Sequence, residues 1–347
     1  MVRGSTRRRG RWPFAGQTLD AVALLIGLIL IALLLRAFIA GVFLPLSGFR
    51  VDVGDFTAWA QRLASLGPGG FYAPGYFSDY PPGYLYVLWL LGSVGSFVGG
   101  LTGTNITGGL VKIPAILADA GVAALLFVFC RRFLEGRFGG RWGETLGLVA
   151  ATVYLFNPGT IFDSAVWGQV DSVGALVILA TLYLLARGWT EAAAVGAVVA
   201  LLIKFQFGFL VPVVAIVGLK RHLFGRSSDP ALHQRRDTVR VLTSLAAGLG
   251  SLVLLILPFR LAVWAPNDAT HSLVDKLIEA ANTYHGLSIN AFNLWRNPWS
   301  GLGDAMQWGC DAPSLAPDTG CVGGIAFTVG SAVVTWQLVG MTLFGLA

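Results

Sequence analysis

Residues 20–44 read DAVALLIGLILIALLLRAFIAGVFL, an apolar run with almost no charge. An α-helix rises 1.5 Å per residue, so a run of this length can cross a hydrocarbon layer roughly 30 Å thick. The basic start before it resembles a signal peptide, but the run exceeds the usual apolar core of about 7 to 15 residues and lacks a clear small-x-small cleavage site. We therefore expect a first membrane span that is retained.

Further apolar runs follow along the chain. Hydrophobic residues make up 55% of the sequence, charged residues only 12%, and the mean hydropathy is +0.70. A soluble domain carries roughly a quarter charged residues, so lipid must cover much of this chain. The predicted class is all-α, a polytopic transmembrane helical bundle in a single domain over 1–347. Besides 20–44, helices are expected near 109–130, 144–162, 165–186, 190–203, 206–219, 241–263 and 323–347.

The basic residues are clustered, and the clusters predict the orientation. Five arginines lie in 1–11, and six Lys or Arg residues lie in 220–240. Cytoplasmic loops carry such an excess, so 1–18 is interpreted as a cytoplasmic tail, and 45–108 and 264–322 as outer loops. A span over 84–100 would place the arginines of 131–141 outside, so we expect that segment to lie in the interface or to re-enter. The same bias explains the net charge of +6 without nucleic acid.

Two features are unusual for a simple bundle. The segment 189–219 has roughly 31 residues, whereas two full spans need about 40, so its centre at Lys204-Phe205-Gln206 is predicted to lie at membrane depth against protein or a water-filled cavity. Cys310 and Cys321 share the second outer loop, and we expect a disulfide between them.

Ionisable residues within apolar context are candidates for function because a charge in a membrane costs roughly 2.5 to 3.5 kcal/mol. Lys112, Asp119, Asp171 and Lys204 are of this kind, and mutual pairing between helices is the alternative. Lys112 could instead extend to the interface. Asp55 could cap the amphipathic helix that follows it, or it could accept a proton or hold a divalent metal, with Asp52 sharing that work.

These residues belong to an ordered set of short motifs. The sequence contains an acidic first outer loop, Asp79-Tyr80-Pro81-Pro82, Lys112 followed by Asp119, Asn157-Pro158, Trp167-Gly168-Gln169-Val170-Asp171, Lys204-Phe205-Gln206 and Asn290-Ala291-Phe292-Asn293-Leu294-Trp295. In this order, over about residues 20–300, the chain resembles the GT-C superfamily of membrane glycosyltransferases. It is most similar to bacterial mannosyltransferase-related proteins akin to the GPI-anchor mannosyltransferases.

The resemblance implies a GT-C type bundle with juxtamembrane helices in the first outer loop, in a bacterial plasma membrane with a cytoplasmic N-terminus. It implies transfer of a sugar, with mannose as the example, from a polyprenyl-phosphate donor to a glycan, lipid or protein acceptor on the outer face, with inversion. The catalytic carboxylate would be Asp55 or Asp52. Lys112 and Lys204 would face the donor phosphate. The substrate pocket would contain Asp79, Tyr80, Trp167, Gln169, Asp171, Gln206, Asn290 and Asn293.

The sequence departs from the family at two points. Two residues separate Asp52 from Asp55, where an Asp-x-Asp pair is common, so use of Mg²⁺ or Mn²⁺ at these carboxylates stays open. The chain also stops at Ala347 near an apolar run, whereas relatives continue with more spans, so we expect a truncated chain. A secondary transporter with a site at the membrane midplane and a non-catalytic membrane scaffold are the alternative functions.

Overall fold

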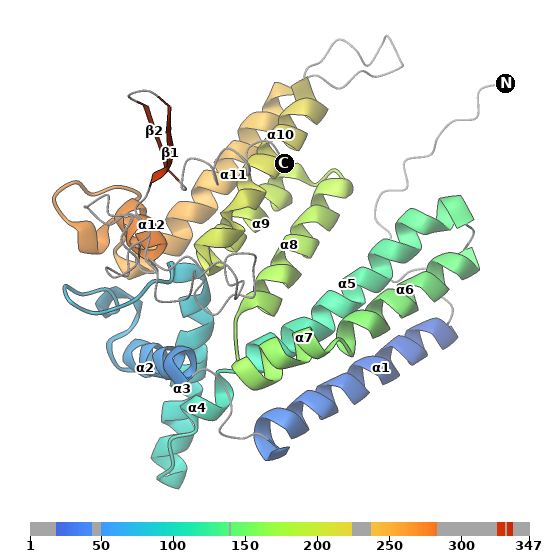
Figure 1. Ribbon diagram of the computed structural model, residues 1–347, viewed down its shortest axis with the longest axis horizontal. Helices are drawn as coiled ribbons and strands as arrows, with labels where there is room; N and C mark the ends of the chain where they lie inside the picture. Colours follow the sequence, from blue (N-terminus) through green and yellow to red (C-terminus); the bar gives the residue numbers. More distant parts are fainter. Residues whose placement is uncertain are drawn as a thin grey trace. The chain divides into compact units, whose positions relative to one another are not determined.

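The computed structural model describes residues 19–43, 50–138, 140–223, 237–282, 325–329 and 332–335. The chain forms two compact units, 1–276 and 277–347. The first unit is built from helices (Figure 1). The predicted disulfide and the pocket residues Asn290 and Asn293 lie outside the described residues.

The helices follow one another with short connections. The α-helices are α1 Leu19–Phe38, α2 Arg50–Leu66, α3 Pro82–Thr102, α4 Thr107–Leu110, α5 Ile113–Phe138, α6 Gly140–Leu155, α7 Pro158–Ile161, α8 Asp171–Ala186, α9 Thr190–Ile203, α10 Leu210–Leu223, α11 Thr238–Ile256 and α12 Leu273–Asn282. Short π- or 3₁₀-helical segments are η1 Ile39–Phe43, η2 Pro68–Gly70, η3 Phe162–Trp167, η4 Phe205–Phe209, η5 Leu257–Phe259 and η6 Ala269–His271.

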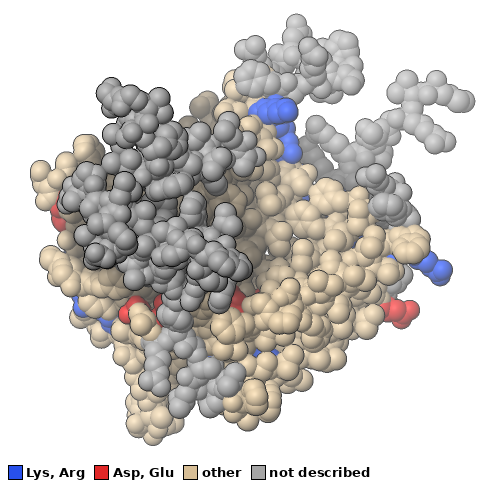
Figure 2. Space-filling model, viewed as in Figure 1, with Lys and Arg blue, Asp and Glu red and all other residues tan. Residues whose placement is uncertain are grey.

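The protein has the helices of a multi-pass membrane protein. Five helices in the described ranges are long and apolar enough to cross a bilayer, over Asp20–Phe43, Pro82–Thr102, Thr107–Leu134, Phe205–Leu223 and Thr238–Phe259. Large apolar side chains on them are exposed, as lipid-facing residues would be. In the space-filling view most of the described surface on this face is neither acidic nor basic (Figure 2).

Two predicted helices are interrupted where the sequence disfavours a continuous helix. The helix expected over 144–162 ends at Leu155, and a second piece, Pro158–Trp167, is bent from it by 50°. Pro158 lacks an N–H, and Asn157 caps the new piece by accepting a hydrogen bond from the Gly159 amide at 2.7 Å. The helix expected over 165–186 begins only at Asp171, because Gly168 adopts a left-handed conformation with φ of 85°.

The segment α3 is long enough to cross a membrane, but the chain then turns back along it. Thr107 lies directly against Gly95, and Thr104 faces Gly99. Before α3, Tyr80 packs against Phe56 of α2, and the chain is beside α2 again at Lys112. The chain therefore contacts or approaches α2 both before and after α3. That 84–100 makes no net crossing of the bilayer stays a prediction.

Basic residues occur near the ends of helices that flank the α5–α6, α8–α9 and α10–α11 connections. Arg131 pairs with Glu144 across α5 and α6 at 3.5 Å, and Arg240 of α11 forms an ion pair with Glu191 of α9. Arg221 donates to the Leu185 carbonyl. These contacts tie neighbouring helices together near the basic connections, and the cytoplasmic location of the connections stays a prediction.

In the second unit, the described residues of 323–347 are strands rather than the expected helix. β1 Ile325–Val329 and β2 Ala332–Thr335 pair antiparallel. The prediction of a helical span was wrong for these residues. Their Val, Ile and Thr side chains are branched at Cβ, which favours strands, and hydropathy alone does not distinguish the two structures.

Candidate active site

The carboxylates of the first outer loop lie on a helix. α2 begins at Arg50, so Asp52 is in its first turn and Asp55 one turn later on the same face. Asp55 therefore does not cap the helix, and the capping interpretation is wrong. Phe56 and Trp59 lie on the same face of α2 as the two carboxylates and are buried against Tyr80, which anchors this face of the helix.

Asp52 is held by two residues from the motif that precedes α8. The indole Nε1 of Trp167 donates to Asp52 Oδ2 at 2.7 Å, and the amide Nε2 of Gln169 donates to the same oxygen at 2.5 Å. The three residues were expected in one site, and the structure brings them into contact. These two hydrogen bonds to one Asp52 oxygen join α2 to this motif.

Gly168 allows that approach. A side chain at Gly168 would lie 3.1 Å from Cγ of Lys112 and 3.5 Å from Cγ2 of Val53, and its φ of 85° disfavours other residues. The ammonium of Lys112 donates to the carbonyls of Ala165 and Val166 at 3.2 and 3.0 Å. Lys112 is buried, and its ammonium satisfies carbonyls at the end of the π-helical turn, so these bonds show an anchoring role.

Lys204 and Asp171 form an ion pair, with 2.9 Å between Nζ and Oδ1. Asp171 is the first residue of α8, and Lys204 lies in extended conformation between α9 and the short turn η4. The side chain of Asp171 is 50% exposed and that of Lys204 20% exposed. The predicted break at Lys204 is confirmed, and the pair is accessible from the open side of the site.

Asp55 lies between other carboxylates. Partial burial and then the negative charges of Asp79 and Asp52 raise the pKa of Asp55 above its usual value. Burial and the charges of Asp171, Asp79 and Asp52 likewise raise the pKa of Tyr80. Within the part of the chain that the structure describes, the Asp55 carboxylate accepts no hydrogen bond. It is therefore a carboxylate that a substrate hydroxyl can approach.

Sequence reasoning missed Arg36 and Asp163. Asp163 lies in the turn η3, its carbonyl accepts bonds from the amides of Gly168 and Gln169, and its carboxyl group lies near enough to Asp171 to interact with it electrostatically. A single acidic residue in an apolar helical run, as at Asp163, is the signal that could have found it.

Arg36 lies beneath the site and is completely buried. Its Nε donates to Asp119 Oδ2 at 2.8 Å and to Ser164 Oγ at 3.3 Å, and Nη1 donates to the Leu155 carbonyl. Asp119 also accepts bonds from Tyr154 and from Ser172, the neighbour of Asp171. The alternative given to Asp119, mutual pairing between helices, is the role that the structure shows.

Two other expected residues lie at the edges of described elements. Gln206 is exposed next to Lys204, and Asp79, whose charge acts on Asp55, is part of the segment that leads into α3. Among the described residues, no group of three or more His, Cys, Asp and Glu side chains is arranged to hold a metal ion. Asp52 and Asp55 supply two carboxylates, so we derive no chemical step through a metal.

Comparison of the chain with models of protein families, with curated protein sequences and with solved structures found no match. A proposed function therefore has to rest on the residues of the candidate active site. A carboxylate that accepts no hydrogen bond from the described residues can accept a proton, and the ammonium group of Lys204 can attract an anion.

Proposed function

We propose that the protein is a membrane glycosyltransferase of GT-C type that transfers a sugar from a polyprenyl-phosphate donor. The observation that supports it is the position of Asp55 on α2. It lies one turn after Asp52, and the Asp52 carboxylate is fixed by hydrogen bonds from Trp167 and Gln169. In the described part of the chain Asp55 accepts no hydrogen bond, and Tyr80, which interacts electrostatically with Asp52 and Asp79, also interacts with Asp171 of the accessible Lys204–Asp171 pair.

In this proposal Asp55 is the general base. It accepts the proton of the acceptor hydroxyl while that oxygen bonds to the anomeric carbon, and the bond from that carbon to the phosphate oxygen breaks. The electron pair stays on the lipid phosphate, where the Lys204 ammonium offsets the new charge. Attack from the side opposite the leaving group inverts the anomeric centre. The raised pKa of Asp55 makes it a better proton acceptor than an ordinary carboxylate.

The other residues bind the sugar and maintain the geometry. Gln169, Asp171 and Tyr80 supply hydrogen-bonding groups to the sugar in this proposal, and Trp167 offers an aromatic ring that can lie against it. Lys112 contributes by holding the turn that carries Trp167. Mannose is the proposed sugar, and a bacterial plasma membrane with the site on the outer face is the proposed location.

The test uses the full chain in phospholipid nanodiscs. Radiolabelled polyprenyl-phosphate mannose and glucose are supplied in turn, together with a bacterial membrane extract as the source of acceptor. The proposal expects label in a new glycolipid, glycan or glycoprotein with the parent, and none with Asp55→Asn. No labelled product from any supplied donor, with folded protein, would contradict it.

A secondary transporter is the second candidate, since α9 and α10 form a hairpin broken at Lys204, with Asp171 as its ion-pair partner. In sealed proteoliposomes a transporter would accumulate free sugar without forming a glycosylated product. The same vesicles therefore separate the two functions. A scaffold would do neither.

A further inference from the structure

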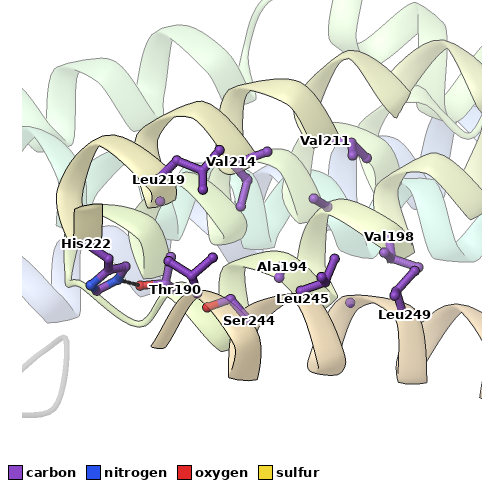
Figure 3. Close-up of a pocket in the computed structure, with 15 residues that line it drawn as sticks. Thr190, Ala194, Val198, Val211, Val214, Leu219, His222, Ser244, Leu245 and Leu249 are labelled. Carbon is purple, nitrogen blue, oxygen red and sulfur yellow. Dashed lines mark hydrogen bonds between the residues drawn. The ribbon is translucent and has the colours of Figure 1, made fainter. Parts of the chain in front are cut away.

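A groove on the first unit lies away from the candidate active site. It is formed by α9, α10 and α11 and has a volume of about 320 Å³ (Figure 3). Small residues make room for it on each helix, such as Ala194 on α9, Ala215 on α10 and Gly248 on α11. Apolar side chains, including Val198, Val211, Val214, Leu219, Leu245 and Leu249, make up most of its lining.

The hydroxyl groups of the groove are already used. Thr190 Oγ1 and His222 Nε2 lie 2.7 Å apart, and Ser244 donates to the Arg240 carbonyl at 2.7 Å. The remaining lining offers no polar partner to a ligand, so the occupant must be a hydrocarbon.

The dimensions suit one lipid chain. Along α10 the lining extends from Val211 to His222, which is about 17 Å at 1.5 Å per residue. One leaflet of a hydrocarbon layer is about 15 Å thick. Both α10 and α11 belong to span-length segments, so the groove is at bilayer depth.

The end of the groove nearest His222 is basic. Lys220, Arg221 and His222 form the last turn of α10. Lys220 is exposed, whereas Arg240 on the facing helix is paired with Glu191. Cations at the membrane surface attract anionic lipid headgroups, worth about fivefold in affinity for each Lys or Arg. A lipid whose chain enters the groove would have its phosphate at this end.

We propose that the groove binds one chain of an anionic phospholipid from the leaflet at the basic end, with the phosphate beside Lys220 and His222. This site is separate from the carboxylates of the proposed active site and holds whether or not that function is correct. The lipid would fill space between α9, α10 and α11 and steady their packing near the basic connections.

The test is native mass spectrometry of the full chain purified in detergent with phosphatidylglycerol or phosphatidylcholine added. The parent should retain one phosphatidylglycerol at lower lipid concentration than phosphatidylcholine. Ala215→Trp, which fills the groove from an exposed position, should abolish that retention. Ala246→Trp, at an exposed position of α11 outside the groove, is the matched control and should retain it.

Charge is tested separately. Lys220→Gln should weaken phosphatidylglycerol binding about fivefold, whereas Arg132→Gln, at the exposed end of α5, should not. Equal retention of both lipids by the parent, or unchanged retention in Ala215→Trp, would overturn the proposal. Displacement of phosphatidylglycerol by an equimolar amount of polyprenyl phosphate would assign the groove to the donor and also overturn it.

Discussion

At the scale of single residues, the contrast between Asp52 and Asp55 decides how the site can work. The two carboxylates share a face of α2, yet Asp52 accepts two side-chain hydrogen bonds and Asp55 accepts none in the described part of the chain. A carboxylate fixed by Trp167 and Gln169 organises the site, whereas one without such bonds can react. Two experiments separate these roles.

We predict that Asp55→Asn lowers sugar transfer by about 10² or more while the protein stays folded, because asparagine has nearly the same size but cannot accept the proton. Initial rates in nanodiscs with saturating donor measure it. Asp52→Asn is the matched variant, and it should mainly weaken the junction with Trp167 and Gln169. Full activity of the Asp55 variant together with loss in the Asp52 variant would move the base three residues upstream.

The pH dependence provides a second test at this scale. A general base acts only when ionised, so activity should rise with pH through the raised pKa of Asp55, above the range of an ordinary aspartate. Burial is the first cause of that shift and Asp79 the next, so Asp79→Asn should move the rising limb to lower pH without removing the whole shift. A limb that does not move in Asp79→Asn would contradict this electrostatic coupling.

At the scale of elements, the length of α3 and the path of the chain after it give different information about its place in a membrane. Its 21 residues and hydropathy meet the criteria for a span, but Thr107 lies against Gly95 and the chain is back beside α2 by Lys112. Hydropathy indicates which helices lipid can surround, whereas the contacts of Thr107 and Lys112 show that the chain turns back toward α2 after α3.

The predicted consequence is that Arg131–Arg141 is cytoplasmic. In a chain whose three native cysteines are replaced by serine, a cysteine at Gly139 should not react with an impermeant maleimide added to intact cells. A cysteine at Gln61, an exposed position on the same helix as Asp52 and Asp55, should react. Labelling at Gly139 but not at Gln61 would show that the orientation is inverted.

At the scale of the whole first unit, the Arg36–Asp119 pair links four parts of the bundle. Arg36 is on α1, Asp119 on α5, and their hydrogen bonds extend to Tyr154 of α6 and Ser172 of α8. Both charged side chains are at most 1% exposed. Because the pair is buried, removing one partner leaves the other charge without compensation.

We predict that Asp119→Ala destabilises the protein by about 3 to 5 kcal/mol, seen as a markedly lower unfolding temperature in detergent. The double variant Arg36→Met with Asp119→Leu should recover much of that loss, because no charge is then left buried. If the single and double variants unfold at the same temperature, the unpaired charge is not the cause.

The sequence by itself determined the membrane class, the approximate positions of most helices and the break at Lys204, and it grouped Asp52, Trp167 and Gln169, which the structure brings into contact. Apolar runs, prolines and isolated charges are local signals, and they act through lipid solvation and backbone geometry. Local signals could not show that Asp55 lies inside a helix, that Lys112 is tied to carbonyls, or that the residues near 325–335 form strands.

Those properties depend on contacts between elements that are far apart in the sequence. Arg36 was overlooked within an apolar run because its partner Asp119 is 83 residues away, and no local pattern connects them. Asp52 likewise has hydrogen-bond partners more than 100 residues away, at Trp167 and Gln169. Tertiary packing decided these contacts, because a buried charge or polar group is stable only where the fold supplies a partner from another element.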